Sequence, residues 1–343
     1  MAAIVAAIAA VTVRPSAGFI ERVYTNGAYA RWEPIAHALT NWCPWSLGDL
    51  AVLVGLLAIA WRIAVSVRGH TFPPWRRAAA AALEILVVLA LYAIWFEAGW
   101  GWNYDRAPIA ARVRYEPARV TPAAMSALRA RAIAEMNALA PAAHARALRA
   151  PDIDALRAAW LPVVQRAGDT WTPHVGSPKF TLANPIMNLN GTSGFINPLS
   201  LTVQTASDLL WFERPFDLAH EWSHLAGYAR EDEANYLAAL TCLRSTDPVA
   251  RYSGWLELFL YLPPQSHYAR ATFVPLVWSD FAAIRRRDAR HVNLSFARFS
   301  WRAYNAYLKS NRVAAGVQSY GAVTNLMLAV PLDARRLPVT ART

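Results

Sequence analysis

The chain has 343 residues and a formal net charge of +11, and 55% of its residues are hydrophobic while only 17% are charged. This length allows one or two domains with a real core, and the composition is more apolar than that of a typical soluble domain. The basic residues are mostly arginines scattered along alanine-rich segments, and the sequence carries no helix-turn-helix, finger or aromatic-rich sheet motif. The charge therefore does not indicate a nucleic-acid-binding protein.

Three apolar runs open the chain. The run at 2–13 is too short to span a bilayer comfortably, and we expect a short or truncated helix there rather than a signal peptide, because no basic stretch precedes it. The runs at about 47–67 and 78–97 approach the roughly 20 residues that a transmembrane helix needs. Glu84 interrupts the later run, and such a group lies near the headgroups or faces a helical partner. The alternative is a pair of buried core helices.

The loop between the two long runs predicts the orientation. Residues 62–77 contain four arginines and no acid, and short basic loops stay in the cytoplasm. We therefore expect a membrane domain at 1–98 and an extracytoplasmic domain at 99–343. Aromatic residues near the outer ends of the spans are expected to form an interfacial belt: Trp42, Trp45, Trp95, Trp100, Trp102 and Tyr104.

The rest of the chain has a largely helical pattern. Residues 122–141 and 152–168 have apolar positions at helical spacing, and further helices are expected up to about residue 330. Residues 170–200 are rich in Pro, Gly, Asn, Thr and Ser, which predicts a loop with one or two short strands. The two cysteines, Cys43 and Cys242, are expected to be free and buried.

The segment FDLAHEWSHLAGYAREDEANYLAAL, at 216–240, carries the strongest chemical signal. His220 and His224 stand four residues apart, so both project from the same face of a helix and can bind one zinc ion together. Glu221 is placed to take a proton from a water on the metal. Apolar neighbours indicate that this helix is buried, and buried histidines and carboxylates need a partner such as a metal. The alternative is a surface helix with two histidines and an ion pair.

A third ligand is expected on the next helix. Gly227 allows the first helix to end, and a second helix is expected to begin at Glu231. Glu231 and Asn235 share a face of that helix. We expect Glu231 to bind the metal and Asn235 to orient a histidine, with Glu233 as the alternative ligand.

Two further sets of residues are candidates for substrate chemistry. A strand upstream of a zinc helix can bind a substrate backbone by strand addition. The residues expected to form such a substrate-binding edge, called the ledge below, are Asn190, Gly191, Ser193, Gly194 and Phe195. The alternative is a tight structural turn. Tyr320, in GVQSYGAV, is the preferred donor to an oxyanion, and the other candidates by residue type are Tyr252, His291 and Arg302.

The chain resembles an uncharacterised bacterial family of membrane proteins, a domain-of-unknown-function family with a zinc-peptidase-like HExxH signature. The resemblance rests on the HExxH stretch and on segments along most of the chain, including GWGWNYDRAP, GTSGFINPLSL, EDEANYLAALTC and YNAYLKSNRVAAGVQSYGAVTNLMLA. The motif is also similar to that of gluzincin membrane peptidases, in which E-x-x-A-D follows HExxH and its glutamate binds zinc. Here EDEAN offers Glu231 for that role, with Asn235 where aspartate is usual and at a much shorter distance from HExxH.

The resemblance implies a mainly α protein in which two or three N-terminal transmembrane helices precede a helical zincin-like metallopeptidase domain with a small strand and loop region. It also implies a multi-pass protein of the bacterial inner membrane, whose partners are the lipid bilayer and a peptide or protein substrate. The expected activity is zinc-dependent hydrolysis of peptide bonds outside the cytoplasm, with Glu221 activating the water. The alternatives are a zinc hydrolase of a non-peptide or cell-wall bond, and a non-catalytic binding scaffold that the metal stabilises.

Overall fold

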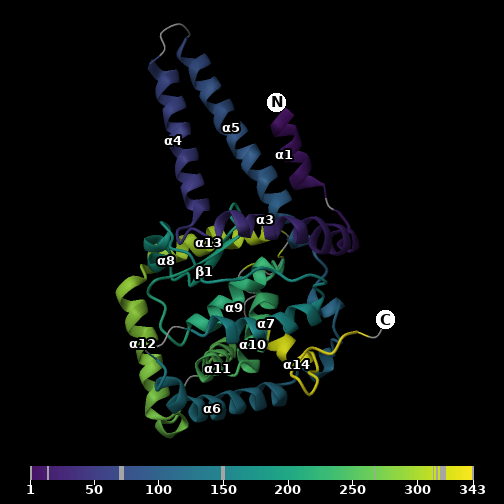
Figure 1. Cartoon of the computed structure of the whole chain (residues 1–343). Coiled ribbons are helices and arrows are strands. Elements are labelled where there is room, and N and C mark those ends of the chain that lie inside the picture. Colours follow the sequence, from purple (N-terminus) through teal and green to yellow (C-terminus); the bar gives the residue numbers. More distant parts are fainter. Residues whose placement is uncertain are drawn as a thin grey trace.

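The computed structural model describes residues 2–13, 15–68, 73–147, 151–265, 267–311, 313, 316 and 322–341. In this part of the chain the fold is mainly helical, with a small antiparallel sheet. Figure 1 shows two long helices, α4 (Leu47–Arg68) and α5 (Pro74–Gly99), that stand out from a globular body. A short helix, α1 (Ala2–Thr12), packs along α5.

The two long helices have the length and composition of membrane spans. Within the described residues, Leu47–Val65 and Pro74–Gly99 are long and apolar enough to cross a bilayer, and only 6% of the most apolar 18-residue stretch of each is buried inside the protein. They confirm the two long apolar runs as span candidates. Glu84 of α5 faces a helical partner, because its carboxylate pairs with Arg62 of α4 at 2.5 Å. The side of the membrane that the body occupies stays a prediction.

The status of α1 is different. Its 11 residues extend about 16 Å at 1.5 Å per residue, which is roughly half of a hydrocarbon core. The described helix pair Ala2–Thr12 and Ala17–Thr40 reaches the required length only jointly and with a bend. The protein therefore has two candidate spans, or three if this bent pair forms one.

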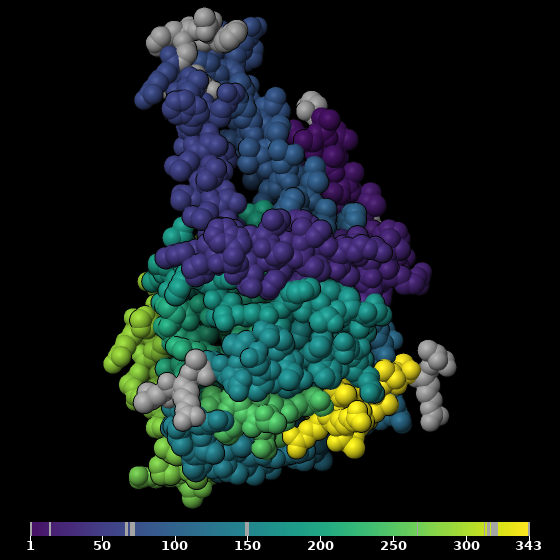
Figure 2. Space-filling view, viewed as in Figure 1, coloured from purple at the N-terminus to yellow at the C-terminus, as the bar shows by residue number. Residues whose placement is uncertain are grey.

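Short helices between α1 and α4 lie across the top of the body, beneath the protruding helices (Figures 1 and 2). They are α2 (Ala17–Phe19), the π-helix η1 (Ile20–Tyr29) and α3 (Ala30–Thr40). Tyr29 is fully buried, and its hydroxyl donates to the carbonyl of Leu225 at 2.8 Å. These helices share the core of the body, so this part of residues 1–98 packs with the chain beyond residue 99. The predicted domain boundary itself stays a prediction.

Helix α10 (Glu231–Arg244) lies at the centre of the body. It packs against α9 (Arg214–Leu225), α11 (Pro248–Tyr261), α7 (Ile153–Ala167) and α14 (Val323–Ala329). Helix α6 (Pro122–His144) packs on α11 and on α12 (Pro275–His291), and α12 also contacts α11 through side chains. Helix α13 (Leu294–Ser310) packs on the short helix α8 (Asn184–Asn190). Single 3-10 turns connect these elements: η2 (Gly101–Asp105), η3 (Ile109–Ala111), η4 (Pro117–Arg119) and η5 (Arg270–Thr272).

The predicted helices after the spans are confirmed, and their ends have local causes. The Thr121 side chain accepts from the Ala124 N–H at the start of α6, and Asp152 accepts from the Ala155 N–H at the start of α7. Gly168 ends α7 with a φ of 129°, a conformation that favours glycine. Such caps satisfy N–H and carbonyl groups that the helix itself leaves unpaired.

The loop expected at 170–200 is only partly a loop. Strand β1 (Gly194–Asn197) pairs with β2 (Thr202–Thr205) in antiparallel register from Gly194↔Thr205 to Asn197↔Thr202. The expected strand is therefore present, but α8 (Asn184–Asn190) was not predicted. Its composition is typical of loops, yet Pro185 sits in the first turn, where its missing N–H costs nothing, and Met187 is buried.

The two cysteines are free, as expected. Cys242 is buried, whereas Cys43 is only half-buried, just after α3.

Candidate metal centre

Helix α9 carries the HExxH residues and is buried along nearly its whole length. Every residue from Pro215 to Leu225 is buried, because β1 and β2, α7, α10 and α11 all contact this helix. His220 and His224 share one face, as their spacing predicts, and their Nε2 atoms lie 3.0 Å apart.

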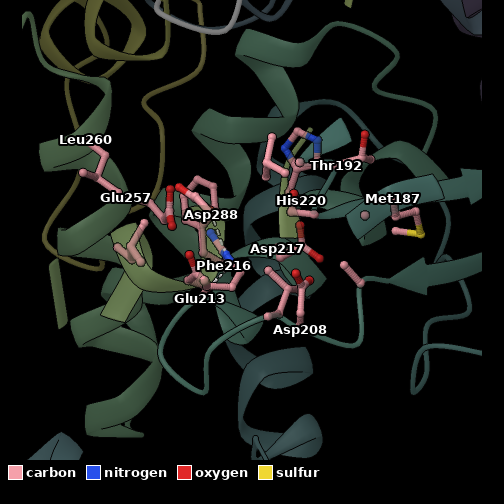
Figure 3. Close-up of a pocket in the computed structure, with 18 of the residues that line it drawn as sticks. Met187, Thr192, Asp208, Glu213, Phe216, Asp217, His220, Glu257, Leu260 and Asp288 are labelled. Atoms are coloured by element: carbon pink, nitrogen blue, oxygen red, sulfur yellow. Dashed lines mark hydrogen bonds and ion pairs between the residues drawn. The ribbon is translucent and has the colours of Figure 1, made fainter. Parts of the chain in front are cut away.

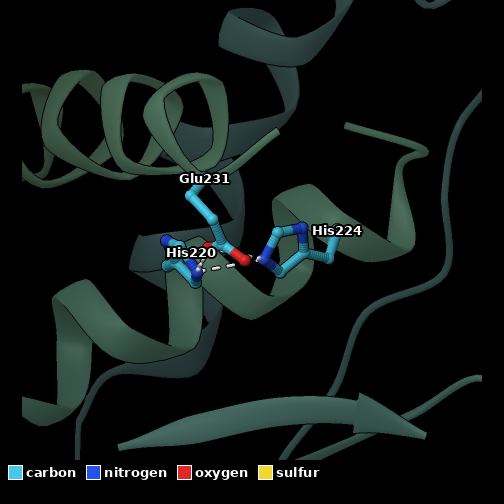
Figure 4. Close-up of side chains that lie close together, drawn as sticks. All are labelled: His220, His224 and Glu231. Atoms are coloured by element: carbon cyan, nitrogen blue, oxygen red, sulfur yellow. Dashed lines mark hydrogen bonds and ion pairs between the residues drawn. The ribbon is translucent and has the colours of Figure 1, made fainter. Parts of the chain in front are cut away.

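The third group comes from the start of α10. Gly227, with a φ of 84°, ends the turn after α9, where a Cβ would come within 2.8 Å of Asn103 Oδ1. The chain then reverses so that Glu231 Oε2 lies 3.3 Å from His220 Nε2 and 3.4 Å from His224 Nε2 (Figure 4). Glu233 does not reach the histidines: its Oε1 accepts the N–H of Ile109 at 2.7 Å. The structure therefore brings Glu231, and not Glu233, to the predicted ligand pair.

The geometry of these three atoms fits a metal ion. The triangle of His220 Nε2, His224 Nε2 and Glu231 Oε2 has sides of 3.0, 3.3 and 3.4 Å. Ligands at about 2.0–2.1 Å from a tetrahedral zinc ion lie about 3.3–3.4 Å from one another. The two sides that end at Glu231 match this spacing and the side between the histidines is shorter, so this buried group of His220, His224 and Glu231 could hold a metal.

Neighbouring groups orient two of the three candidate ligands. The Nδ1–H of His224 donates to the carbonyl of Tyr228 at 2.7 Å, which leaves the lone pair of its Nε2 facing the centre. Glu231 Oε1 accepts the hydroxyl of Tyr304, on α13, at 2.6 Å, so that Oε2 is the oxygen that faces the imidazoles. These contacts are of the kind that fixes the tautomer and orientation of metal ligands.

Asn235 and His220 both line the larger of the two cavities at the centre. Burial lowers the pKa of His220, and side-chain interactions with Glu231 and Asn235 offset this only in part. Tyr261 donates to Asn235 Oδ1 at 3.2 Å, and among the described residues neither His220 Nδ1 nor Asn235 Nδ2 has a hydrogen-bond partner. The role of Asn235 in orienting a histidine stays a prediction.

The centre has an excess of buried carboxyl groups. Asp217, Glu221 and Glu231 are all buried, and in the described part of the chain no Lys or Arg forms an ion pair with any of them. Burial, Asp217 and Glu231 together raise the pKa of Glu221 well above its usual value. Burial alone would raise the pKa of Glu231 as well, but the adjacent imidazoles outweigh it and lower that pKa. A bound cation would compensate this cluster of carboxylates.

A buried ion pair supports the end of α9. The Arg106 guanidinium contacts Asp169 Oδ1 at 2.6 Å and Glu21 at 2.9 Å, and it donates to the carbonyl of Ala226 at 3.1 Å. It also stacks on the ring of Tyr228, 4.3 Å from the centroid. Arg106 thereby holds the turn whose Tyr228 carbonyl orients His224.

Two cavities meet at the centre. The larger, of about 290 Å³, is lined by Asp217, His220, Glu221 and β1, and it also has acidic side chains from other elements (Figure 3): Asp208, Glu213, Glu257 and Asp288. The smaller, of about 140 Å³, is aromatic, and its lining includes Phe96, Trp100, Tyr104, Tyr304 and Tyr307. His220, Glu221 and Gly194 line both cavities. The centre therefore lies in a cleft with one acidic and one aromatic end.

Strand β1 runs beside Glu221 along this cleft. A Cβ on Gly194 would come within 2.7 Å of Glu221 Oε1 and 2.8 Å of Asp217 Oδ2, so a larger residue there would displace these carboxylates. β1 pairs with β2 on one side, and in the described two-stranded sheet its other edge is unpaired. An unpaired edge can accept an extended peptide.

The other residues of the predicted ledge differ in where they lie. Gly191 and Ser193 line the larger cavity and Phe195 lines the smaller one. Asn190 lines neither cavity; its amide donates to Ser300 at 3.0 Å and its Oδ1 accepts the N–H of Thr192. Substrate binding by this ledge stays a prediction.

The candidate oxyanion donors within the described residues lie away from the centre. Tyr320 lies outside the described residues. Tyr252 is buried beside Asp280, to which its hydroxyl donates, and His291 and Arg302 are exposed. These last three do not line either of the two cavities.

Several functional neighbours of the centre were not predicted. Trp100 and Tyr104 were expected at the headgroups, but both are buried: Trp100 donates to the carbonyl of His224 at 3.0 Å, and Tyr104 lines the aromatic cavity. Asp217 and Tyr304 were also missed. Asp217 stands one turn before Glu221, a spacing that could have identified it, whereas no local signal points from Tyr304 to Glu231.

Comparison with known proteins identifies the family of this chain. The family model described as "Protein of unknown function (DUF3810)" matches residues 24–328, so the chain belongs to this family. No curated protein and no solved structure matches the chain.

Proposed function

We propose that this member of the DUF3810 family is a membrane-anchored, zinc-dependent metallopeptidase that hydrolyses peptide bonds outside the cytoplasm. The observation that carries the proposal is the convergence of His220, His224 and Glu231 close to Glu221 and to β1, one edge of which is unpaired in the described sheet. A purely structural zinc site closes its fourth position with a protein ligand and needs no adjacent base. Here three ligands stand together in a cleft and a carboxylate lies next to them.

The chain's own residues supply the parts of a hydrolytic mechanism. His220, His224 and Glu231 would hold the ion. When bound, zinc lowers the pKa of a water molecule towards neutrality and polarises the substrate carbonyl. Glu221 accepts the proton as the water oxygen attacks the carbonyl carbon, and it passes that proton to the amine nitrogen as the C–N bond breaks. His224 is kept in the ligand tautomer by Tyr228.

The cleft favours a polypeptide over other substrates. A peptide added to the free edge of β1 would run past Glu221, with its residues on either side of the scissile bond in the two cavities. The acidic lining of the larger cavity favours a cationic group of the substrate on that side. Arg287, in the same cavity, illustrates this preference because it pairs with Glu213 at 2.5 Å. The aromatic cavity favours an apolar side chain.

The test is cleavage of a peptide mixture by the purified full-length chain loaded with zinc. Cut products are identified by mass spectrometry, and zinc content is measured for each variant. Glu221→Gln should retain zinc and lose turnover, while His220→Ala should lose both. Glu233→Gln is the matched control, because this buried glutamate of α10 points away from the centre, and it should retain both.

Each other outcome has a defined meaning. Full activity of Glu221→Gln would refute the proposed mechanism. Zinc binding without cleavage of any peptide would favour the metal-stabilised scaffold, or a hydrolase of another bond.

A further inference from the structure

Helix α13 joins the metal centre to an exposed apolar surface. On its inner face, Tyr304 donates to Glu231, and Tyr307 lines the aromatic cavity. The same helix also carries large exposed apolar side chains: Leu294 and Phe299 are 72% and 69% exposed. The helix has no acidic residue, and its exposed basic residues are Arg298, Arg302 and Lys309. A basic helix with large apolar side chains is typical of one that lies in the plane of a membrane surface.

The exposed apolar side chains of α13 belong to a larger apolar surface, which we call the apolar collar. The collar consists of exposed side chains from α3 and the segment that follows it, from α8 and the segment that precedes it, and from α13: Ile35, Leu39, Trp42, Phe180, Leu182, Ile186, Leu189, Leu294, Phe296 and Phe299. Figure 1 places these three helices at the end of the body from which α4 and α5 emerge. So many large exposed apolar side chains on one face indicate an interaction surface.

Direct contacts tie the collar to the bases of the candidate spans. Ser46, just before α4, donates its N–H to the carbonyl of Phe180 at 2.8 Å. Trp32 of α3 packs edge-on against Trp95 of α5, with centroids 5.4 Å apart. The collar is therefore continuous with the helices expected to cross the bilayer, and its occupant is the lipid surface of the same membrane.

The aromatic cavity lies at this same level. Phe96, in the last turn of α5, lines the cavity together with Tyr307, and the two rings are in edge contact at 6.3 Å. His224 and Glu231 line the same cavity. A segment leaving the lipid beside α5 would thus meet the centre within a few residues.

We propose that the substrate is a polypeptide anchored in the same membrane, cut in the segment that directly follows its membrane anchor. This inference rests on the proposed peptidase function. The residues next to the anchor occupy the aromatic cavity, and the segment continues along β1 into the acidic cavity. A cavity of about 140 Å³ holds a single benzene-sized group rather than a lipid tail, so a polypeptide fits better than a lipid.

The test uses the zinc-loaded full-length chain in vesicles of zwitterionic and anionic phospholipids. One substrate pool carries a short randomised segment after an apolar helix of about 20 residues, which anchors it in the bilayer. The matched pool has the same segments without the anchor. Because the shared membrane raises the effective concentration, anchored segments should be cut at least about tenfold faster, within the first few residues. A photoreactive group in these residues should crosslink to Phe195 or Tyr307 of the Glu221→Gln variant.

The outcomes separate this inference from the proposed function. Equal cleavage of both pools would overturn the inference and leave the peptidase intact. Cleavage of neither pool would overturn both, and release of phospholipid tails instead would identify a lipid substrate.

Collar variants test the surface itself. Leu294→Glu/Phe299→Glu should slow cleavage of the anchored pool about tenfold, the effect expected when apolar contacts with the interface are lost, without changing the rate on the soluble pool. The control is Leu332→Glu, another exposed apolar position (37%), which follows α14 at the far end of the body (Figure 1). Zinc content reports that each variant is folded. Equal slowing on both pools, or none, would contradict a role for the collar in presenting the substrate.

Discussion

Replacing Arg106 with methionine should lower the free energy of unfolding by about 3–5 kcal/mol, the usual loss when one partner of a buried ion pair is removed. Arg106 is only 4% exposed, and Asp169, its partner at 2.6 Å, is also buried. Without Arg106 the only hydrogen-bond donor left to the Asp169 carboxylate, among the described residues, is the Tyr228 hydroxyl at 3.2 Å, and the carbonyl of Ala226 loses its donor. The lost hydrogen bonds add to this decrease in the free energy of unfolding, whereas protonation of Asp169 limits the decrease.

The assay is guanidinium unfolding of the detergent-solubilised chain, followed by tryptophan fluorescence. Arg131→Met is the control, because Arg131 is largely exposed and lies 3.9 Å from Glu135; it should change stability by less than about 1 kcal/mol. Adding Asp169→Asn to Arg106→Met should restore part of the loss, since no unpaired charge then remains. If Arg106→Met is as stable as Arg131→Met, the reasoning about the buried pair is wrong.

Three more predictions concern the centre and α3. Gly194→Ala should reduce turnover and retain zinc, because the added Cβ would lie 2.7 Å from Glu221 Oε1; unchanged turnover would contradict the placement of β1. Tyr304→Phe should weaken zinc affinity about 10–100-fold, the effect of losing a contact that orients a ligand such as Glu231, as measured by chelator competition. Burial raises the pKa of Glu33 to about 7, so the folded chain holds this proton up to higher pH than the unfolded chain does. That contribution to stability is complete below about pH 4.5 and is lost as pH rises through 7, so between pH 5 and 8 the wild-type melting temperature should fall further than that of Glu33→Gln.

The parts of the fold that depend on local patterns were predictable. α4 and α5 coincide with continuous apolar runs, and α6 and α7 begin at residues that cap helices. The spacing of His220 and His224 places both rings on one face of any helix, and Gly227 marks the reversal that brings Glu231 back to them. For these residues the chemistry follows from helical geometry alone.

The residues that the sequence did not reveal depend on distant contacts. Tyr304 reaches Glu231 only because α13 returns across the top of the body, and no periodicity encodes that path. Trp100 and Tyr104 have the composition of an interfacial belt, but the turn η2 directs both side chains into the core. In α8, loop-forming residues adopt a helix because Met187 finds an apolar partner. In each case tertiary packing overrides a local preference.

Zinc content of the purified chain is the most direct measurement of the central claim. The account predicts about one zinc per wild-type chain, with two nitrogen ligands and one carboxylate visible by X-ray absorption, and loss of that zinc in both His224→Ala and Glu231→Ala. Glu233→Ala should retain it, because Glu233 binds the N–H of Ile109 instead. A wild-type chain that binds no zinc, or a Glu231→Ala variant that binds it unchanged, would contradict a metal centre at these three residues.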